Sequence, residues 1–117
     1  VVLTNTLLGM VIDVNTRKPV LGAGRGGLSG AAMHPVAVRA VYDVHEALPH
    51  LPIVGVGGTT SGADVVEFLL AGASAVEVGT ATFADPRAPR RILKEFEKWC
   101  ERRGVSTVAE LIGAAHG

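Results

Sequence analysis

The chain has 117 residues, of which 48% are hydrophobic and 15 are glycines, a composition typical of a soluble globular protein with many strand-to-helix turns. Its 11 basic and 11 acidic side chains cancel, and no apolar run approaches the ~18 residues of a membrane span, so neither nucleic acid nor a membrane is favoured as a partner. No signal peptide is visible, and the single cysteine, Cys100, excludes an internal disulfide framework and favours a reducing, cytoplasmic location.

The first predicted element is a buried strand at 1–4, a short β-branched run that ends at the polar pair Asn5-Thr6. Because this apolar run opens the sequence with no cap or turn before it, we expect the chain to be a segment of a larger fold. Residues 9–30 alternate apolar and polar side chains, which predicts a hairpin-like excursion around 15–17 followed by a glycine-rich loop. Apolar residues at helical spacing then predict a helix over 34–48.

Strands and helices continue to alternate in the second half of the chain. The pattern predicts strands at 51–56 and 74–78 and helices at 61–73 and 89–104. Ser61 stands at the start of the first of these helices, and Gly72 and Gly104 mark the two helix ends. A last short helix is predicted over 106–115. Ser106 and Glu110 do not have capping-box spacing, so Ser106 alone is the candidate for its N-cap.

Strands that alternate with helices and read as continuous apolar runs predict a parallel sheet covered by helices. Three strands are too few to close a barrel, and a complete (β/α)₈ barrel takes about 250 residues. We therefore predict the α/β class, with residues 1–117 as one segment: the last three βα units, or C-terminal part, of a TIM (β/α)₈ barrel. A small open three-stranded α/β domain is the alternative.

Polar or glycine-rich stretches recur where the parallel strands are predicted to end. They are TNT at 4–6, GGLSG at 26–30, GVGG at 55–58 and VGT at 78–80. Ligands of α/β sheets bind at the carboxyl ends of the strands. Glycine there lets backbone N–H groups approach phosphate oxygens, and the dipole of the following helix adds a favourable field. One such stretch is more often only a tight turn, but all four together favour a phosphate site.

The combination of NTL, GGLSGAAMHPVAVR, LPIVGVGG and AGASAVEVGTATFADP resembles the C-terminal part of a dihydroorotate dehydrogenase catalytic subunit. The resemblance runs over residues 2–87 and is closest to the class 1B branch, since class 1A enzymes are expected to read NS where this chain reads NT. It implies a (β/α)₈ barrel that binds FMN and oxidises dihydroorotate to orotate in de novo pyrimidine biosynthesis. It also implies a homodimer joined to an electron-transfer subunit that carries FAD and a 2Fe-2S cluster and reduces NAD.

The resemblance implies roles for eight residues. Asn5 and Thr6 would contact orotate, and Thr4 would lie beside the flavin. The FMN contacts that it implies are Thr4, Gly30, Gly57, Gly58, Gly79 and Thr80, the last four around the phosphate. Asparagine offers a donor and an acceptor suited to a pyrimidine edge, and threonine offers a hydroxyl. From the residues alone, however, a strand-terminal turn with local side-chain hydrogen bonds explains Asn5-Thr6 equally well.

The resemblance places the catalytic base, a cysteine, and a lysine near the flavin earlier in the barrel. Cys100 is no substitute, because its place in the amphipathic helix predicts a half-buried structural residue. We therefore expect no catalytic and no metal-binding residue in this segment, and we predict surface or packing roles for the four histidines. Two residues depart from the pattern of the branch: Glu77 stands where it usually has glutamine, and Thr4 where it commonly has an aliphatic residue. Because burying an unpaired carboxylate is costly, we expect Glu77 to have a partner or access to solvent.

Two other functions remain open at this point. One is a non-catalytic half-barrel module that at most binds a phosphate. The other keeps the barrel and changes the substrate, as in a related pyrimidine dehydrogenase.

Overall fold

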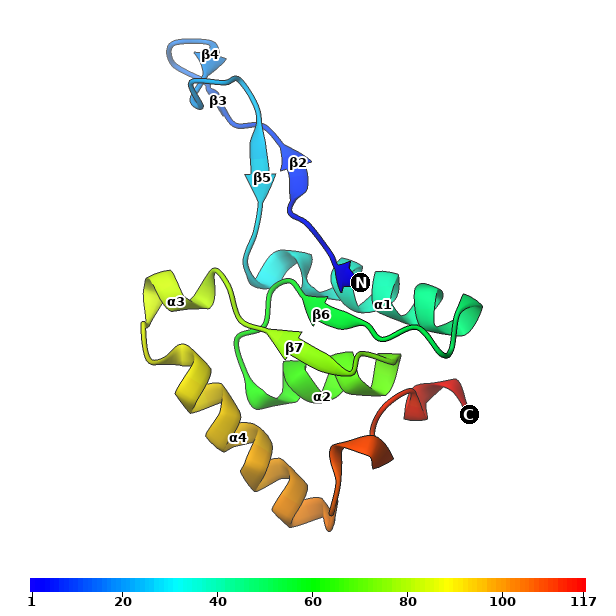
Figure 1. Cartoon of the computed structure of the whole chain (residues 1–117). Coiled ribbons are helices and arrows are strands. Elements are labelled where there is room, and N and C mark those ends of the chain that lie inside the picture. Colours follow the sequence, from blue (N-terminus) through cyan, green and yellow to red (C-terminus); the bar gives the residue numbers. More distant parts are fainter.

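The computed structural model describes residues 1–117 and is built around a three-stranded parallel sheet (Figure 1). Its strands are β1 (Val2–Leu3), β6 (Val54–Val56) and β7 (Ala75–Glu77), in the order β1-β6-β7. Val2 pairs with Val54, and Val54 pairs in turn with Ala75. The predicted alternation of helices with parallel strands is confirmed, and the strands are shorter than the apolar runs that predict them.

Two helices cover one face of this sheet, α1 (His34–Ala47) and α2 (Gly62–Ala71). The amphipathic helix α4 (Ala88–Arg103) packs against α2, and the short α3 (Ala81–Ala84) precedes it. The ends of α2 follow the sequence signals, since Ser61 is the N-cap and Gly72 is left-handed at the C-cap with φ of 117°. Gly104 ends α4 in the same way, with φ of 68°. No helix combines the length and apolar composition that a membrane crossing requires.

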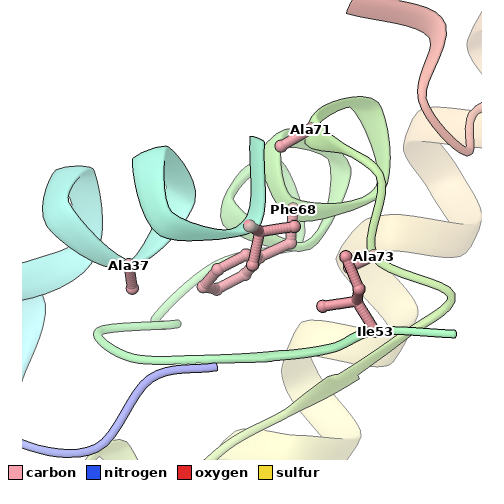
Figure 2. Packing of buried hydrophobic residues seen from close by; sticks show 6 residues of the cluster. Ala37, Ile53, Phe68, Ala71 and Ala73 are labelled. Atoms are coloured by element: carbon pink, nitrogen blue, oxygen red, sulfur yellow. The ribbon is translucent and has the colours of Figure 1, made fainter. Parts of the chain in front are cut away.

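The core lies between the sheet and helices α1 and α2 (Figure 2). Phe68 of α2 is fully buried and packs on the bare backbone of β6, where a Cβ at Gly55 would lie 2.6 Å from its Cδ1. The other buried residues of this cluster are Ala37, Val41, Ile53, Ala71 and Ala73. Gly55 is therefore a packing glycine, which lets an aromatic ring lie directly on the central strand.

The opposite face of the sheet is uncovered within this chain. Leu3 and Val76 pack against the core cluster, so alternation along the strands turns Val2 and Ala75 to the other side. Val2 is 57% exposed, and Ala75 is exposed as well. The prediction of a buried strand at 1–4 is thus wrong for its first two residues, because no layer lies over that face. Glu77, on the same face as Ala75, has the solvent access expected of it.

A long arm, residues 7–28, projects away from the sheet (Figure 1). In the arm β2 (Leu7–Gly9) pairs antiparallel with β5 (Gly26–Leu28), and β3 (Ile12–Asp13) pairs with β4 (Lys18–Pro19) nearer the tip. The predicted excursion is confirmed as a hairpin. The glycine-rich loop expected after it is partly wrong, since residues 26–28 form a strand. The arm stretches the molecule to 55 Å, and the radius of gyration is 16.4 Å, against about 13 Å for a compact chain of this length.

The C-terminal prediction also needs correction. Instead of one helix over 106–115, two 3₁₀ turns form, η2 (Val108–Glu110) and η3 (Ala114–His116). Gly113 between them has a left-handed φ of 74°, which interrupts any continuous helix. The cap of η2 is Thr107 rather than Ser106, and the carboxylate of Glu110 accepts the N–H of Thr107 at 2.9 Å.

Candidate functional site

One cleft of about 240 Å³ opens where the strands of the parallel sheet end. Its walls come from the loops that follow β1, β6 and β7 and from the turn η1 (Ala31–Met33) with the residues just before it. All eight residues assigned to ligands from the sequence line it: Thr4, Asn5, Thr6, Gly30, Gly57, Gly58, Gly79 and Thr80. The structure brings them together from four separate stretches of the chain, and their binding roles remain predictions.

At two of these positions glycine is required both by the backbone conformation and by the space available. Gly57 and Gly58, after β6, have φ of 138° and 68°, values that L side chains rarely adopt. A Cβ at Gly58 would lie 2.7 Å from the carbonyl oxygen of Gly30, and one at Gly57 would lie 2.8 Å from the Cβ of Ala37. The loop thus packs on the start of α1 through contacts that only glycine permits.

Gly79 is different, because nothing within the chain requires a glycine there. No atom lies within 4 Å of a Cβ built on it, and its φ is outside the left-handed range. A glycine that the fold does not need, on the wall of a cleft, points to a requirement from outside the chain.

Several backbone N–H groups of the cleft have no acceptor within the chain. They belong to Gly57, Gly58 and Thr59 after β6 and to Gly79 and Thr80 after β7. The hydroxyl of Thr59 is also without a partner, although the residue is only 4% exposed. Buried polar groups are seldom left unpaired in proteins. The cleft therefore offers a set of unpaired donors and no charged side chain, which is chemistry suited to an anion.

The first turn of α2, next to this cleft, is already occupied by carboxylates. Asp64 accepts the N–H groups of Thr60 and Ser61 at 2.8 Å each, and Glu95 of α4 accepts that of Gly62 at 2.9 Å. Burial works to raise the pKa of Asp64, but hydrogen bonds from Thr60 and Ser61 outweigh it and lower that pKa. The N–H groups of Thr60, Ser61 and Gly62 at the start of α2 therefore already have acceptors within the chain, and the role of the helix dipole stays a prediction. Donors from the loops remain.

Asn5 and Thr6 form the local turn that the sequence left open as an alternative. The Oδ1 of Asn5 accepts the N–H of Thr6 at 2.7 Å. Its amide nitrogen has no partner in the chain, and both side chains are exposed toward the cleft. A Cβ at Gly27 would overlap Thr6, so this glycine lets the arm lie directly against it. The turn fixes Asn5 with its donor free, and the two interpretations are compatible.

Sequence reasoning missed two residues of this region. His34, predicted only as a surface or packing residue, is 7% exposed, and its Nδ1 donates to the carbonyl of Gly57 at 2.8 Å. Thr59 carries the unpaired buried hydroxyl. His34 gives no signal in the sequence because its partners lie on other elements, whereas the place of Thr59 directly after GVGG was available as a signal.

Cys100 lies on α4 and is not part of the cleft. It is half-buried, as predicted, and burial raises the pKa of its thiol. A raised pKa disfavours the thiolate, which is the reactive form.

Comparison with known proteins agrees with this architecture. Residues 1–99 match the family model described as dihydroorotate dehydrogenase. The chain is 54% identical over 112 residues to the "Dihydroorotate dehydrogenase B (NAD(+)), catalytic subunit" of Desulforamulus reducens. It is 53% identical over 111 residues to the "Putative dihydroorotate dehydrogenase A (fumarate)" of Solibacter usitatus. These matches cover 96% and 95% of this chain and 36% of each relative, so the chain spans about a third of their length.

A solved structure extends the likeness to three dimensions. The crystal structure of the Eimeria tenella enzyme "DHODH in complex with ferulenol" superposes with a TM-score of 0.80 at 28% identity, over 98% of this chain and 30% of that one. The parallel βα units and this superposition define the class of protein, an α/β chain that forms part of a (β/α)₈ barrel. More particularly, the chain belongs to the dihydroorotate dehydrogenase family, and it corresponds to the C-terminal part of a catalytic subunit.

Proposed function

We propose that this chain forms the FMN phosphate site and part of the orotate site of a dihydroorotate dehydrogenase, as the C-terminal segment of one FMN-binding barrel domain. The observation that carries the proposal is the convergence, in one cleft, of eight residues from four stretches with backbone donors that have no acceptor in the chain. The family resemblance supports FMN as the phosphate ester that these donors meet.

The residues of the cleft fit the phosphate end of FMN. Gly57 and Gly58 leave their N–H groups uncovered by any Cβ, and Gly79 and Thr80 present theirs from the neighbouring strand end. Groups of this kind bind phosphate through the backbone without a cationic side chain. Gly30 lies across the cleft beside Thr80, whose Cγ2 is 4.0 Å from a Cβ built on Gly30.

A bound FMN would supply the hydride acceptor for the oxidation of dihydroorotate to orotate, and the base that takes the proton would lie outside this segment. This segment contributes orientation. The free amide donor of Asn5 and the hydroxyl of Thr6 hold the substrate, and Thr4 borders the flavin. No residue here is proposed as the base, and the raised pKa of Cys100 accords with that.

The electron acceptor and the partners belong to the proposal as well. The Desulforamulus reducens relative is named for NAD and the Solibacter usitatus relative for fumarate. We favour the NAD-linked form, because the NT motif at Asn5-Thr6 resembles class 1B. That form implies a homodimer with a second subunit carrying FAD and a 2Fe-2S cluster, in the cytoplasm that the single cysteine favours.

The test needs a closed barrel. A complete subunit can be built by joining the upstream part of the Desulforamulus reducens relative to residues 1–117, and it is called the complete subunit below. We expect it to purify yellow, to bind FMN more tightly than riboflavin, which lacks the phosphate, and to oxidise dihydroorotate. A subunit that binds FMN no better than riboflavin contradicts the phosphate site, and one that binds FMN but oxidises only another pyrimidine supports the related dehydrogenase instead.

Gly79→Ala sharpens this test. Gly22 on the arm is a matched control, since it too has open space around it and no left-handed φ. We expect Gly79→Ala to weaken FMN binding about tenfold, the equivalent of one charge-assisted hydrogen bond, with thermal stability of the apoprotein unchanged. Gly22→Ala should change neither quantity. Equal FMN affinity in the two variants would count against the assignment of Gly79 and Thr80 to the phosphate.

A further inference from the structure

His34 joins three elements at the back of the cleft. It is the first residue of α1, and its ring lies edge-on to Phe68 of α2 with centroids 4.9 Å apart. Its Nδ1 donates to the carbonyl of Gly57 in the loop after β6 at 2.8 Å. The residue is 7% exposed and does not line the cleft itself. It therefore acts on the cleft only through the loop that it holds.

The bond to Gly57 sets the direction of a neighbouring donor. In a trans peptide the C=O and the following N–H point to opposite sides, and the only cis peptide in this chain is Leu3–Thr4. With the carbonyl of Gly57 turned toward His34, the N–H of Gly58 points away from His34, and both glycines line the cleft. This N–H is one of those with no acceptor in the chain.

The other nitrogen of the ring is anchored by α2. Nε2 lies 2.9 Å from Oε2 of Glu67 and 3.8 Å from Oδ1 of Asp64. The ligand atoms of these three residues lie within 4.8 Å of one another, and the hydrogen bonds already made account for that spacing without an ion. The carbonyl oxygen of Gly57 can only accept, so Nδ1 is the donor of that bond, while Nε2 lies within hydrogen-bond distance of the Glu67 carboxylate. Glu67 thus fixes the ring that fixes the loop.

We propose that His34 is a positioning residue, which holds the Gly57–Gly58 peptide so that the N–H of Gly58 meets the phosphate of FMN, with Glu67 as its anchor. This inference rests on the proposed function and deepens it. It assigns phosphate affinity to a residue that touches neither flavin nor phosphate. Glycine gives the loop its shape, but two glycines in sequence are also the most mobile backbone a chain can have, and His34 supplies the constraint.

Two substitutions test the two hydrogen bonds of the His34 ring one at a time. In His34→Asn the amide nitrogen replaces Nδ1, so the bond to Gly57 is kept and that to Glu67 is lost. In His34→Gln the longer side chain places its nitrogen near Nε2, so the bond to Glu67 is kept and that to Gly57 is lost. The readout is the ratio of FMN to riboflavin affinity in the complete subunit, measured by flavin fluorescence, because a general packing defect weakens both ligands alike.

We expect His34→Gln to weaken FMN about tenfold and riboflavin little, as the loss of one hydrogen bond predicts, and His34→Asn to stay within about threefold of the parent. Glu67→Ala, at a side chain that is 60% exposed, avoids disturbing the core and should weaken FMN about threefold through loss of the anchor. Equal FMN loss in the Asn and Gln variants, parallel loss of riboflavin, or unchanged FMN affinity in Glu67→Ala overturns the proposal. A parent that does not distinguish FMN from riboflavin overturns the phosphate site itself, whatever the variants do.

Discussion

At the scale of single residues, the cleft combines groups that the fold requires with groups that it tolerates at a cost. The hydroxyl of Thr59 belongs to the second kind, being buried with no hydrogen-bond partner. Leaving a buried hydroxyl unpaired costs about 1–3 kcal/mol, which valine of similar shape does not incur. A residue kept at such a cost at the edge of the GVGG loop is best explained by a ligand that pairs with it.

Thr59→Val should therefore change stability and binding in opposite directions. In the complete subunit without flavin, we expect the free energy of unfolding to rise by about 1 kcal/mol, because the orphaned hydroxyl is removed. FMN binding should weaken about fivefold to tenfold. Thermal melts of the apoprotein and flavin titrations measure the two effects. A variant that is less stable and binds FMN normally would show that the hydroxyl serves the fold alone.

Asn5 gives a second prediction at this scale, on the side of the cleft that is proposed to bind orotate. Its Oδ1 is held by Thr6, and its amide nitrogen remains free. We expect Asn5→Ala to raise the KM for dihydroorotate or lower kcat by about tenfold with FMN still bound. Asn15→Ala, in the exposed turn at the tip of the arm, is the control. Normal steady-state kinetics in Asn5→Ala would show that Asn5 serves only the local turn and does not bind substrate.

At the scale of elements, α2 directly follows the glycine loop after β6, and the backbone N–H groups at its N-terminus are well satisfied. Ser61 and Asp64 form a reciprocal capping box, and Asp64 also accepts the hydroxyl of Thr60 at 3.0 Å. Glu95 reaches across from α4 to the N–H of Gly62, and this backbone bond, with Arg91, lowers the pKa of Glu95. The carboxylates therefore stabilise the helix start and tie α4 to it.

Asp64→Asn tests this cap through its dependence on pH. The folded pKa of Asp64 is lowered, so its stabilising effect is complete above its unfolded value of about 3.9 and is lost as the pH falls through the lower folded value. We expect Asp64→Asn to destabilise the complete subunit by about 1 kcal/mol at pH 7, and the difference to shrink below pH 4. Denaturant titrations at several pH values measure it.

The control for this prediction is Asp43→Asn. Asp43 is also a helix carboxylate, but it makes only an exposed pair with Arg39 at 3.1 Å, which is worth little. Its substitution should change stability by less than about 0.5 kcal/mol. A loss for Asp64→Asn that is equally large at pH 3 and pH 7 would contradict an effect of the ionised cap.

Elements whose signals are local could be predicted from the sequence, and those that depend on distant partners could not. The helix caps Ser61, Gly72 and Gly104 could be predicted because each acts within its own turn of the chain. Strand β5 could not be predicted, because its glycines have no strand preference and form a strand only by pairing with β2. Likewise, the eight residues of the cleft could be predicted from motifs at strand ends. The role of His34 could not, because it depends on the fold that places Gly57 and Glu67 on either side of its ring.

At the scale of the whole molecule, the chain exposes many large apolar side chains. Only 17 of its 117 residues are buried, and the exposed large hydrophobic side chains include Val2 at 57% on the open face of the sheet. Many others lie on the arm, among them Leu8 at 74% and Val14 at 83%. Strands β1 and β7 are both edges of the parallel sheet, and an exposed edge is a template for pairing with another chain.

The 117-residue chain on its own should therefore self-associate. We expect light scattering after size exclusion to show oligomers or aggregates rather than a 12.1 kDa monomer, and a hydrophobic dye to bind strongly. FMN should bind more weakly than in the complete subunit, because the sheet that spaces the loops after β6 and β7 lacks neighbours on both sides. Adding the upstream part of the barrel covers the open face and both edges, so the complete subunit should lose the dye signal and unfold cooperatively. A monomeric 117-residue chain with a single sharp unfolding transition would contradict this, and would favour the small open α/β domain over a portion of a barrel.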